Sequence, residues 1–376
     1  MSHTQSTRDS TSAYLGEAAE HFGARDSGAE IRRLGAGNVN DTFLVASGPC
    51  RNKRFILQRI NGRVFTMPEW IMQNLRVLTA HVSERLAGVL PAGRRWDMVR
   101  FFETEDCKEF WIDPAGGYWR AMSFIENAES FETIAGPDHA AEVGFAVGFF
   151  HALVSDLAPW TLKDTLEGFH ITPLYLRRYR ERQSGARRFA ASAESAWCID
   201  FIEKRTGLVT VLEDAKTDGR LPLRIIHGDP KVSNVMIDTE TKRAVGIVDL
   251  DTVKPGLVHY DIGDGLRSCC NPLGEEARDP CEVRFEPELC RAFLRGYFSA
   301  AGGFLTEADR EFIYDSIRLI SFELGLRFFT DFLEGDVYFN VEEPEQNLRR
   351  ALVQFRLVES IEAQARALRQ VIGEAQ

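Results

Sequence analysis

The chain has 376 residues, of which 44% are apolar and 27% are charged, so it can bury a large core and disorder is not the default. Its 45 basic and 56 acidic side chains give a formal net charge of -11, which argues against nucleic acid or an anionic membrane as a partner. Any anionic ligand must therefore be held by a local arrangement of groups. The length also favours two compact units over one.

Cysteine usage and the N-terminal residues bear on location. The seven cysteines are odd in number and none stands in a CxxC spacing, so we expect reduced thiols and no structural zinc. Residues 1–12 are rich in Ser and Thr, which predicts a disordered tail rather than a signal peptide. The most apolar stretch, residues 143–154, is shorter than the ~20 residues needed to cross a bilayer. We therefore expect a cytoplasmic protein without a membrane partner, of open oligomeric state.

The first third of the chain has a sequence pattern typical of a small β-sheet. Strands are predicted at residues 31–34, 41–45, 55–60, 98–103, 110–113 and 118–125. A helix should run from about Met67 to Leu86, because Pro68 suits a first helical turn and apolar residues then recur at helical spacing. Residues 13–125 are therefore predicted to form an N-terminal lobe with an antiparallel sheet and one prominent helix.

After about residue 126 the pattern changes to long helices with one strand-like interruption. Helices are predicted at residues 138–156, 172–182, 192–215, 287–301, 306–333 and 344–372. The interruption, residues 223–249, holds the richest concentration of polar motif residues in the chain. The predicted fold class is thus α+β, with a larger, mainly helical lobe over residues 126–376 that carries the chemistry.

A predicted hairpin brings two oxygen ligands together. Two β-type runs, residues 235–238 and 244–248, flank a polar segment of hairpin-loop length. If the hairpin turns about residues 241–242, Asn234 and Asp249 face each other at its open end. Carboxylate and amide oxygens suit Mg²⁺, which commonly completes its shell with water and substrate phosphates. The sequence therefore predicts a magnesium site at Asn234 and Asp249.

A candidate base and a candidate cation lie just before this site. Asp229 precedes Asn234 by five residues in an irregular loop, close enough to accept a proton from an incoming hydroxyl. Phosphoryl transfer chiefly needs positioning and charge neutralisation, and Lys231 can supply a cation for the transferred phosphate. The HGDxxxxN order followed by Asp249 matches the catalytic loop of kinases. The alternative is that Asp229 and Asn234 are only turn formers in a surface loop.

A glycine-rich turn offers a second phosphate site. Residues 35–40 lie between two predicted strands, where backbone N–H groups could lie over nucleotide phosphates. The residues assigned to this loop are Gly35, Gly37, Asn38 and Asn40. An ordinary β-turn would use the same glycines, so the loop alone is weak support for nucleotide binding.

Together these motifs resemble the aminoglycoside phosphotransferase and choline kinase superfamily, and within it the N-acetylhexosamine 1-kinases. The resemblance runs from about residue 21 to residue 362, and its segments are residues 37–42, 55–61, 118–120, 124–126, 227–234, 248–256, 260–264 and 332–339. It implies a two-lobed protein-kinase-like fold with ATP and Mg²⁺ as cofactors. It also implies phosphate transfer to the anomeric hydroxyl of a small-molecule sugar.

The resemblance implies roles for single residues, with two departures from the family pattern. It makes Asp229 the catalytic base and Asn234 and Asp249 the magnesium ligands. Gln58, in the predicted nucleotide site, stands where protein kinases carry their phosphate-binding lysine, so the α/β-phosphate contact has no assigned cation. Asn38 stands where close relatives have His, so substrate preference or phosphate contacts can differ.

Acceptor and supporting residues follow from the same resemblance. Arg327 and Tyr338 match positions expected to line the sugar pocket, and a guanidinium suits a carbonyl or hydroxyl acceptor because it offers several rigid donors. Arg327 could instead be an exposed helix charge. Asp251 would share the face of the metal aspartate two residues earlier on a continuing strand, contacting a sugar hydroxyl or a second metal. His227 and Asp261 are expected to brace the catalytic loop.

Three functional hypotheses remain open at this point. The favoured one is an ATP:sugar phosphotransferase that makes an N-acetylhexosamine 1-phosphate. A second is a kinase for another hydroxyl compound, such as an aminoglycoside, choline or a different hexose. A third, a nucleotide-binding pseudokinase, is disfavoured because Asp229, Asn234 and Asp249 are all present. His151, at the end of an apolar helix, is expected to be a core histidine rather than a ligand.

Overall fold

The computed structural model describes residues 13–25, 28–34, 39–48, 52–183, 192–301 and 303–375. The chain divides into two compact units, Met1–Thr79 with Asp97–Glu126 and Ala80–Trp96 with Asn127–Gln376. Residues 80–96, which the sequence assigns to the N-terminal lobe, therefore fall in the second unit. Four residues of the predicted phosphate loop, 35–38, lie outside the described residues, among them the assigned Gly35, Gly37 and Asn38.

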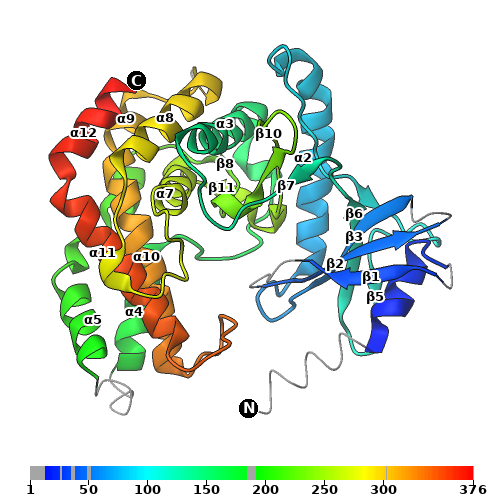
Figure 1. The fold of residues 1–376 in the computed structure, drawn as a ribbon, viewed down its shortest axis with the longest axis horizontal. Helices are drawn as coiled ribbons and strands as arrows, with labels where there is room; N and C mark the ends of the chain where they lie inside the picture. Colours follow the sequence, from blue (N-terminus) through cyan, green and yellow to red (C-terminus); the bar gives the residue numbers. More distant parts are fainter. Residues whose placement is uncertain are drawn as a thin grey trace. The chain divides into compact units, whose positions relative to one another are not determined.

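The first unit is built on a six-stranded sheet whose strands pair antiparallel (Figure 1). The strands are β1 (Glu30–Arg33), β2 (Asp41–Ser47), β3 (Lys53–Ile60), β4 (Phe101–Phe102), β5 (Trp111–Ile112) and β6 (Tyr118–Ser123). Their order is β1-β2-β3-β6-β4, with β5 also paired to β6. The predicted strands at 98–103 and 110–113 shrink to two residues each, because both pair with the same strand, β6.

Alternation along the strands separates an apolar face from a polar row. Phe43, Leu57 and Trp119 pack in a buried cluster with apolar residues of the helix at residues 13–21. Successive strand residues point to opposite faces, so Thr42, Gln58 and Arg120, which are cross-strand partners, form a row on the other face. Helix α2 (Pro68–Val89) follows β3 and begins at its proline, as the sequence predicts.

The second unit is mainly helical (Figure 1). Its helices are α3 (Pro137–Val154), α4 (Thr172–Gln183), α5 (Ala193–Glu203), α6 (Val211–Thr217), α7 (Val258–Cys269), α8 (Pro287–Ala301), α9 (Glu307–Glu311), α10 (Ile313–Glu334), α11 (Gln346–Ala363) and α12 (Ala365–Glu374). Helix α3 packs along α8, and α10 packs against α4, α7 and α11. The α3–α8 approach needs glycine, since a Cβ on Gly144 would lie 1.9 Å from the Phe293 carbonyl oxygen.

Three predicted helices are broken in the structure. The helix predicted over 192–215 ends at Glu203 and resumes at Val211 after the 3-10 turn η3 (Thr206–Leu208), which contains Gly207, a poor helix former. The other two break at Phe312 and Gln364. At each break the packing partners change: α11 contacts α10, whereas α12 contacts α8 more than α10. The helical spacing of apolar residues can continue across such a break, so the sequence pattern does not reveal where the helix is interrupted.

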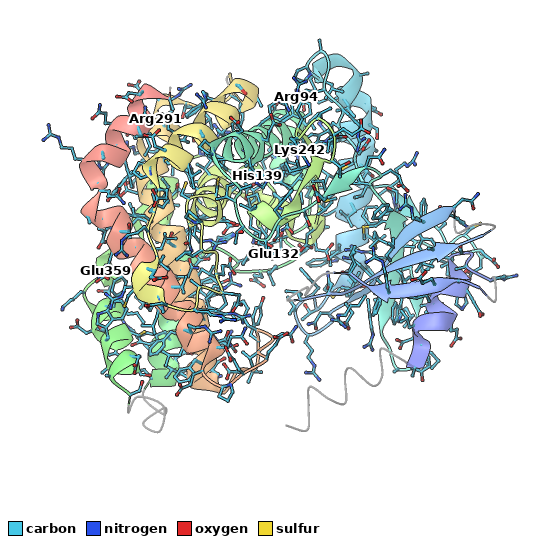
Figure 2. All side chains as sticks on the ribbon, viewed as in Figure 1. Arg94, Glu132, His139, Lys242, Arg291 and Glu359 are labelled. Atoms are coloured by element: carbon cyan, nitrogen blue, oxygen red, sulfur yellow. The ribbon has the colours of Figure 1, made fainter. Side chains whose placement is uncertain are left out.

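Short strands in the second unit support the motif region. The predicted hairpin forms as β9 (Val235–Asp238) and β10 (Ala244–Ile247), with Lys242 at positive φ in its turn (Figure 2). Strand β7 (Ala128–Glu129) pairs with β9, and β8 (Arg224–Ile226) pairs with β11 (Lys254–Gly256). The pair β8–β11 bounds the segment that carries the motif residues, because one strand precedes His227 and the other follows Thr252.

Two features relate to the expected location. No helix of the described residues combines the length and apolar character needed to span a membrane. The six cysteines within the described part of the chain carry free thiols.

Candidate active site

The open end of the β9–β10 hairpin carries the two predicted magnesium ligands. The turn of the hairpin pairs Ala244 with Ile237, and a β-bulge in β10 then shifts the register by one residue, so Val248 stands opposite Asn234. The Val248 N–H donates to the Asn234 carbonyl at 2.8 Å. The predicted pairing of Asn234 with Asp249 is thus wrong by one residue. The hairpin turns about residues 240–241 rather than 241–242, and the bulge offsets only part of that difference.

Asp249 itself lies just beyond the strand. It adopts the left-handed conformation (φ 63°, ψ 57°), which is uncommon for non-glycine residues and frequent at functional sites. The chain then enters the 3-10 turn η5 (Leu250–Thr252), so the strand does not continue to Asp251 and the predicted shared face is wrong. Asp251 is buried, and its carbonyl accepts a hydrogen bond from Thr165 Oγ1 at 2.7 Å.

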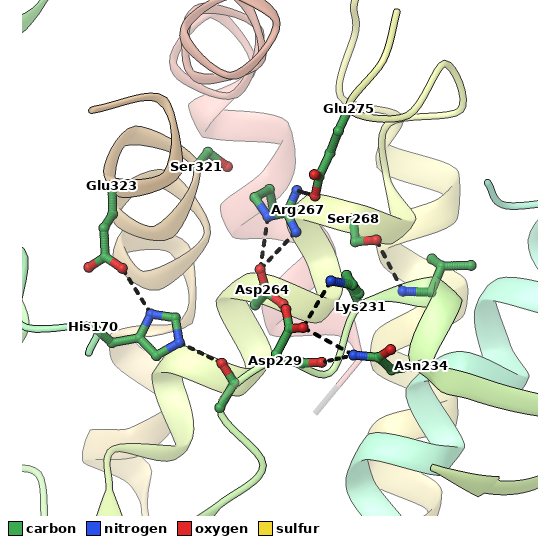
Figure 3. Close-up of polar contacts among 12 residues, drawn as sticks. His170, Asp229, Lys231, Asn234, Asp264, Arg267, Ser268, Glu275, Ser321 and Glu323 are labelled. Atoms are coloured by element: carbon green, nitrogen blue, oxygen red, sulfur yellow. Dashed lines mark hydrogen bonds and ion pairs between the residues drawn. The ribbon is translucent and has the colours of Figure 1, made fainter. Parts of the chain in front are cut away.

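Asp229, Lys231 and Asn234 are brought together (Figure 3). The Asn234 amide nitrogen donates to the Asp229 carbonyl at 2.7 Å and to Asp229 Oδ2 at 3.1 Å. Lys231 Nζ lies 2.9 Å from the same Oδ2, and the Asp229 side chain keeps 28% exposure. The carboxylate is therefore held by a cation and an amide while part of it stays open to an acceptor.

The charges of this pair are mutually stabilised. Burial works to raise the pKa of Asp229, but the charge and hydrogen bond of Lys231 and the nearby His227 hold that pKa below its usual value. Burial likewise works to lower the pKa of Lys231, and the carboxylates of Asp229, Glu275 and Asp249 raise it above its usual value. At neutral pH Asp229 is ionised and Lys231 is charged.

The peptide groups before Asp229 are held by a buried carboxylate. Asp261 on α7 accepts from the N–H of His227 at 2.6 Å and from the N–H of Gly228 at 2.8 Å. His151 Nε2 donates to the same carboxylate at 2.8 Å, which makes it a hydrogen-bonded core histidine. Burial works to raise the pKa of Asp261, but the hydrogen bond and charge of His151 leave it lowered.

His227 is held in one tautomer by its two neighbours. Its Nδ1 accepts from the Asp229 N–H at 3.2 Å, so Nε2 carries the proton and donates to the Val248 carbonyl at 3.0 Å. Burial lowers the pKa of His227, which keeps the imidazole neutral. The side chain thereby ties the loop before Asp229 to the end of the β9–β10 hairpin.

A second buried pair, absent from the sequence prediction, reaches the same loop (Figure 3). His170 Nε2 donates to the Gly228 carbonyl at 2.7 Å, and its Nδ1 lies 2.9 Å from Glu323 Oε1. Thr172 Oγ1 donates to the other Glu323 oxygen at 2.7 Å. Neither His170 nor Glu323 stands in a local motif, so no spacing in the sequence could have indicated them.

A buried ion-pair chain on α7 is a second feature that sequence reasoning missed. Arg267 donates to Asp264 Oδ1 at 2.9 Å and to Glu275 Oε1 at 2.7 Å (Figure 3). The charge of Glu275 contributes to the raised pKa of Lys231, so this chain extends the electrostatic network of the loop. No helix was predicted over residues 258–269, so the three-residue spacing of Asp264 and Arg267 gave no signal in the sequence.

Arg327 on α10 is half-buried in a group of aromatic rings, here called the Arg327 cage. The distances from its guanidinium carbon to the ring centroids are 5.0, 5.3, 5.9 and 5.4 Å, for Phe169, Tyr175, Tyr338 and Phe339 respectively. Within the described ranges, no carboxylate lies at ion-pair distance from Arg327 and no hydrogen bond engages it. The exposed-charge alternative is therefore wrong, because rings cover the guanidinium.

The groups around Arg327 shift its pKa. Burial works to lower its pKa, and the phenols of Tyr175 and Tyr338 oppose that effect. The carboxylates of Glu323 and Asp229 also oppose it, so the pKa of Arg327 ends above its usual value. The guanidinium thus keeps its charge and lies within electrostatic reach of Asp229.

The segment carrying two of the cage rings is fixed to α10. Asp331 accepts hydrogen bonds from three successive N–H groups, those of Val337, Tyr338 and Phe339, at 3.0, 2.7 and 2.9 Å. Asn347 donates to the same carboxylate at 3.0 Å. A charged acceptor shared by four donors holds the turn in one conformation.

In the first unit, the predicted nucleotide residues that the structure describes lie on and beside the polar row. Gln58 Oε1 accepts from Arg120 Nη2 at 2.7 Å, and Gln58 Nε2 donates to Thr42 Oγ1 at 3.0 Å. Asn40 is buried, and its Oδ1 accepts from the Asn61 N–H at 3.0 Å. Gln58 is thus paired with a buried guanidinium on the neighbouring strand.

Comparison with known families identifies the chain. Residues 30–310 match the model of the phosphotransferase enzyme family, which is more than half of the sequence. The chain belongs to this family. The match includes the loop of residues 227–234, the β9–β10 hairpin and the six-stranded sheet, so the phosphotransferase assignment rests on both units.

Several solved structures have the same fold as this phosphotransferase. A microcompartment-associated aminopropanol kinase aligns over 95% of this chain and 98% of its own, with 16% identity and a TM-score of 0.66. An amicoumacin kinase in complex with AMP-PNP and Ca²⁺ aligns over 97% and 96%, with 15% identity and a TM-score of 0.62. An aminoglycoside phosphotransferase from Alicyclobacillus acidocaldarius aligns over 95% and 96%, with 16% identity and a TM-score of 0.61. At these identities the likeness shows the α+β kinase-like fold.

The donor set fits a magnesium ion held mainly by substrate. No group of three or more His, Cys, Asp or Glu side chains in the described parts of this phosphotransferase could hold a metal by itself. Asn234 uses its amide nitrogen on Asp229, which leaves its oxygen as the group able to ligate a cation. Mg²⁺ is commonly bound through one or two protein oxygens plus phosphates and water, and Asn234 with Asp249 meets that pattern.

Proposed function

We propose that this phosphotransferase is a small-molecule kinase that moves the γ-phosphoryl group of ATP to the anomeric hydroxyl of an N-acetylhexosamine. The observation that carries the proposal is the Arg327 cage. It presents a charged guanidinium without a carboxylate partner among the described residues, within electrostatic reach of Asp229. A guanidinium is a rigid donor that suits the carbonyl oxygen of an acetamido group.

The same cage argues against a cationic acceptor. Aromatic rings can bind an ammonium group by cation–π attraction, but the guanidinium of Arg327 already occupies these rings. An aminoglycoside, choline or amino alcohol would bring a second positive charge against the first, which disfavours binding. A neutral, amide-bearing sugar avoids that repulsion, and this separates the proposal from kinases of cationic substrates.

Asp229 acts in this proposal as the base. Its carboxylate accepts the proton of the anomeric hydroxyl as that oxygen forms a bond to the γ-phosphorus. The bond from the γ-phosphorus to the bridging oxygen breaks, and ADP leaves with that oxygen. Lys231 neutralises developing charge, while Asn234 and Asp249 would hold a magnesium ion, whose charge offsets that of the nucleotide phosphates.

The remaining predicted residues receive supporting roles. Tyr338 and Asp251 are proposed to contact the sugar, and His227 and Asp261 to brace the catalytic loop. In the first unit, Gly35, Gly37, Asn38, Asn40 and Gln58 are proposed to contact ATP. The division into a nucleotide-binding part, residues 13–125, and a catalytic part, residues 126–376, belongs to the same proposal. Free thiols support a cytoplasmic location.

An acceptor panel tests the function. The protein is incubated with Mg-ATP and either N-acetylhexosamines, the matching hexoses and hexosamines, choline or an aminoglycoside, and ADP release and product position are recorded. We expect turnover with N-acetylhexosamines, a 1-phosphate product, and weaker turnover with the free amines. Transfer to an aminoglycoside but to no sugar would overturn the proposal. Absence of turnover on every acceptor would overturn the kinase assignment as well.

A further inference from the structure

The peptide group that joins Gly228 to Asp229 is held on both of its polar atoms. Its carbonyl oxygen accepts from His170 Nε2 at 2.7 Å, and its N–H donates to His227 Nδ1 at 3.2 Å. Gly228 has φ 89°, and a Cβ there would lie 2.8 Å from the Thr252 carbonyl oxygen. Because this peptide plane sets the direction in which Asp229 leaves the backbone, its two hydrogen-bond partners also orient the carboxylate.

The hydrogen-bond chemistry assigns the protonation of His170. A carbonyl oxygen can only accept, so Nε2 carries a proton. Glu323 Oε1 is also an acceptor when the carboxylate is ionised, so Nδ1 carries a proton too. His170 with Glu323 is therefore a buried imidazolium–carboxylate pair. Thr172, which donates to the second carboxylate oxygen, keeps Glu323 in this orientation.

The surroundings of His170 agree with a charged ring. Burial works to lower the pKa of His170, but Glu323 on α10, the Gly228 carbonyl and Asp264 on α7 together raise it. Tyr260 on α7 stacks on the ring at 5.2 Å, and Tyr175 on α4 lies beside the His170 backbone. The cation is present below the raised pKa and is lost as pH rises through it.

We propose that His170 and Glu323 are positioning residues for phosphoryl transfer: the ion pair holds the Gly228–Asp229 peptide so that the Asp229 carboxylate meets the acceptor hydroxyl. The inference rests on the proposed role of Asp229 as base. Glu323 and Arg327 lie four residues apart on α10, so they occupy one helix face. This turn of α10 thus carries both Glu323, which supports Asp229 through His170, and Arg327, whose guanidinium lies in the Arg327 cage.

Two substitutions test the pair: His170→Gln and Glu323→Gln. A misplacement of about 1 Å in a reacting group can cost about a hundredfold in rate. We expect kcat to fall by about ten- to a hundredfold in both variants, while KM for acceptor and the affinity for ATP stay within about threefold. His259→Gln is the matched control, since His259 is a buried histidine bonded to the Asp309 carbonyl at 2.8 Å. We expect the control to lose stability but keep kcat.

The pH profile separates positioning from packing. In the native protein, kcat should fall on the alkaline side as His170 loses its proton and one of its two hydrogen bonds. Glu323→Gln removes the charge that favours the imidazolium, so the alkaline fall should move to lower pH. A folded His170→Gln or Glu323→Gln variant with native kcat and an unmoved profile would overturn the proposal. A variant in which KM rises while kcat stays native would overturn the proposal as well.

A measurement on the unaltered protein covers the case in which the variants fail to fold. Nitrogen-15 NMR of the His170 ring, assigned through Thr172→Val or by comparison with His259→Gln, should show both nitrogens protonated at neutral pH. A neutral ring would overturn the proposal. These readouts do not depend on the sugar: kinetics use whichever acceptor the panel identifies, and the NMR uses none. Failure of the N-acetylhexosamine proposal is therefore distinguishable from failure of this one.

Discussion

The predicted catalytic loop, residues 227–234, and the Arg327 cage lie in the same unit, and both hold buried or half-buried charges. In the loop, Asp229 pairs with Lys231, and the peptide groups of His227 and Gly228 donate to Asp261 on α7, which also accepts from His151. In the cage, Arg327 meets aromatic rings, and no ion pair engages it within the described residues. Within the described residues, the charge of Asp229 is paired, whereas the guanidinium of Arg327 has no ion-pair partner.

This difference suggests separate roles for the loop and for the Arg327 cage. A network whose donors and acceptors are all paired is rigid, because each displacement breaks a buried hydrogen bond. A guanidinium held by rings keeps its N–H donors available, and each gains a partner when an acceptor binds. We therefore expect changes in the loop to act on kcat or stability, and changes in the cage to act on KM for the acceptor.

The largest effect is expected for Asp229→Asn. The amide keeps the shape of the side chain but cannot accept the proton, so kcat should fall by about a thousandfold, within the range of general-base contributions. Affinity for ATP should remain. Steady-state ADP release and nucleotide titration measure the two quantities. Asp200→Asn is the control, since Asp200 forms an exposed i,i+4 pair with Lys204. A native rate in Asp229→Asn would show that the base is misassigned.

Asp261→Asn should act mainly on stability. The substitution removes the charge that accepts two backbone N–H groups and His151, and it directs an amide donor at other donors. Breaking such a buried network costs about 3–5 kcal/mol, which corresponds to a melting temperature lower by about 10 °C. Thermal unfolding at neutral pH measures the loss.

The pH dependence of this loss can be checked in the same experiment. The pKa of Asp261 is lowered in the folded protein, so the carboxylate stabilises the fold above its unfolded pKa and this contribution is lost as pH falls through the folded pKa. The difference between native protein and Asp261→Asn should therefore narrow in acid. A constant difference at all pH values would contradict the role of the ionised carboxylate.

Local patterns account for what the sequence predicts well. The strands β2 and β3, the β9–β10 hairpin and the order of Asp229, Lys231 and Asn234 all depend on residues close together in the sequence. Alternation, turn residues and motif spacing report such contacts directly. The α+β fold with a small sheet and a helical lobe follows from where these patterns begin and end.

Long-range contacts account for what it misses. His170 is 58 residues from Gly228, and 153 residues separate it from Glu323, so no spacing rule connects them. The position of the hairpin turn and the bulge in β10 together set the register at Asn234, and alternation of side chains reports neither. The two-residue strands β4, β5 and β7 are too short for a period to emerge. The family resemblance pointed to Arg327 and Tyr338, but only the structure shows the four rings and the lack of an ion pair within the described residues.

Arg327→Met should raise KM for the acceptor. A hydrogen bond to a charged group contributes about 1.5–3 kcal/mol, so the expected increase is about ten- to a hundredfold, with KM for ATP unchanged. Arg327→Lys should not restore binding, because an ammonium lacks the planar set of donors. The control is Arg318→Met on the same helix, whose guanidinium pairs with Glu362 at 2.8 Å. An unchanged acceptor KM in Arg327→Met would show that the Arg327 cage is not part of the acceptor-binding site.

The smallest effect is expected for Asp331→Asn, which loosens the cage without touching Arg327. Three N–H groups of residues 337–339 lose a charged acceptor, so the rings of Tyr338 and Phe339 become less ordered around the guanidinium. A net loss of about 1 kcal/mol would raise the acceptor KM about fivefold. Glu334→Gln is the control, since Glu334 lies at the same helix end but pairs with Arg178 and Arg182. A fall in kcat at constant KM would contradict the division between loop and cage.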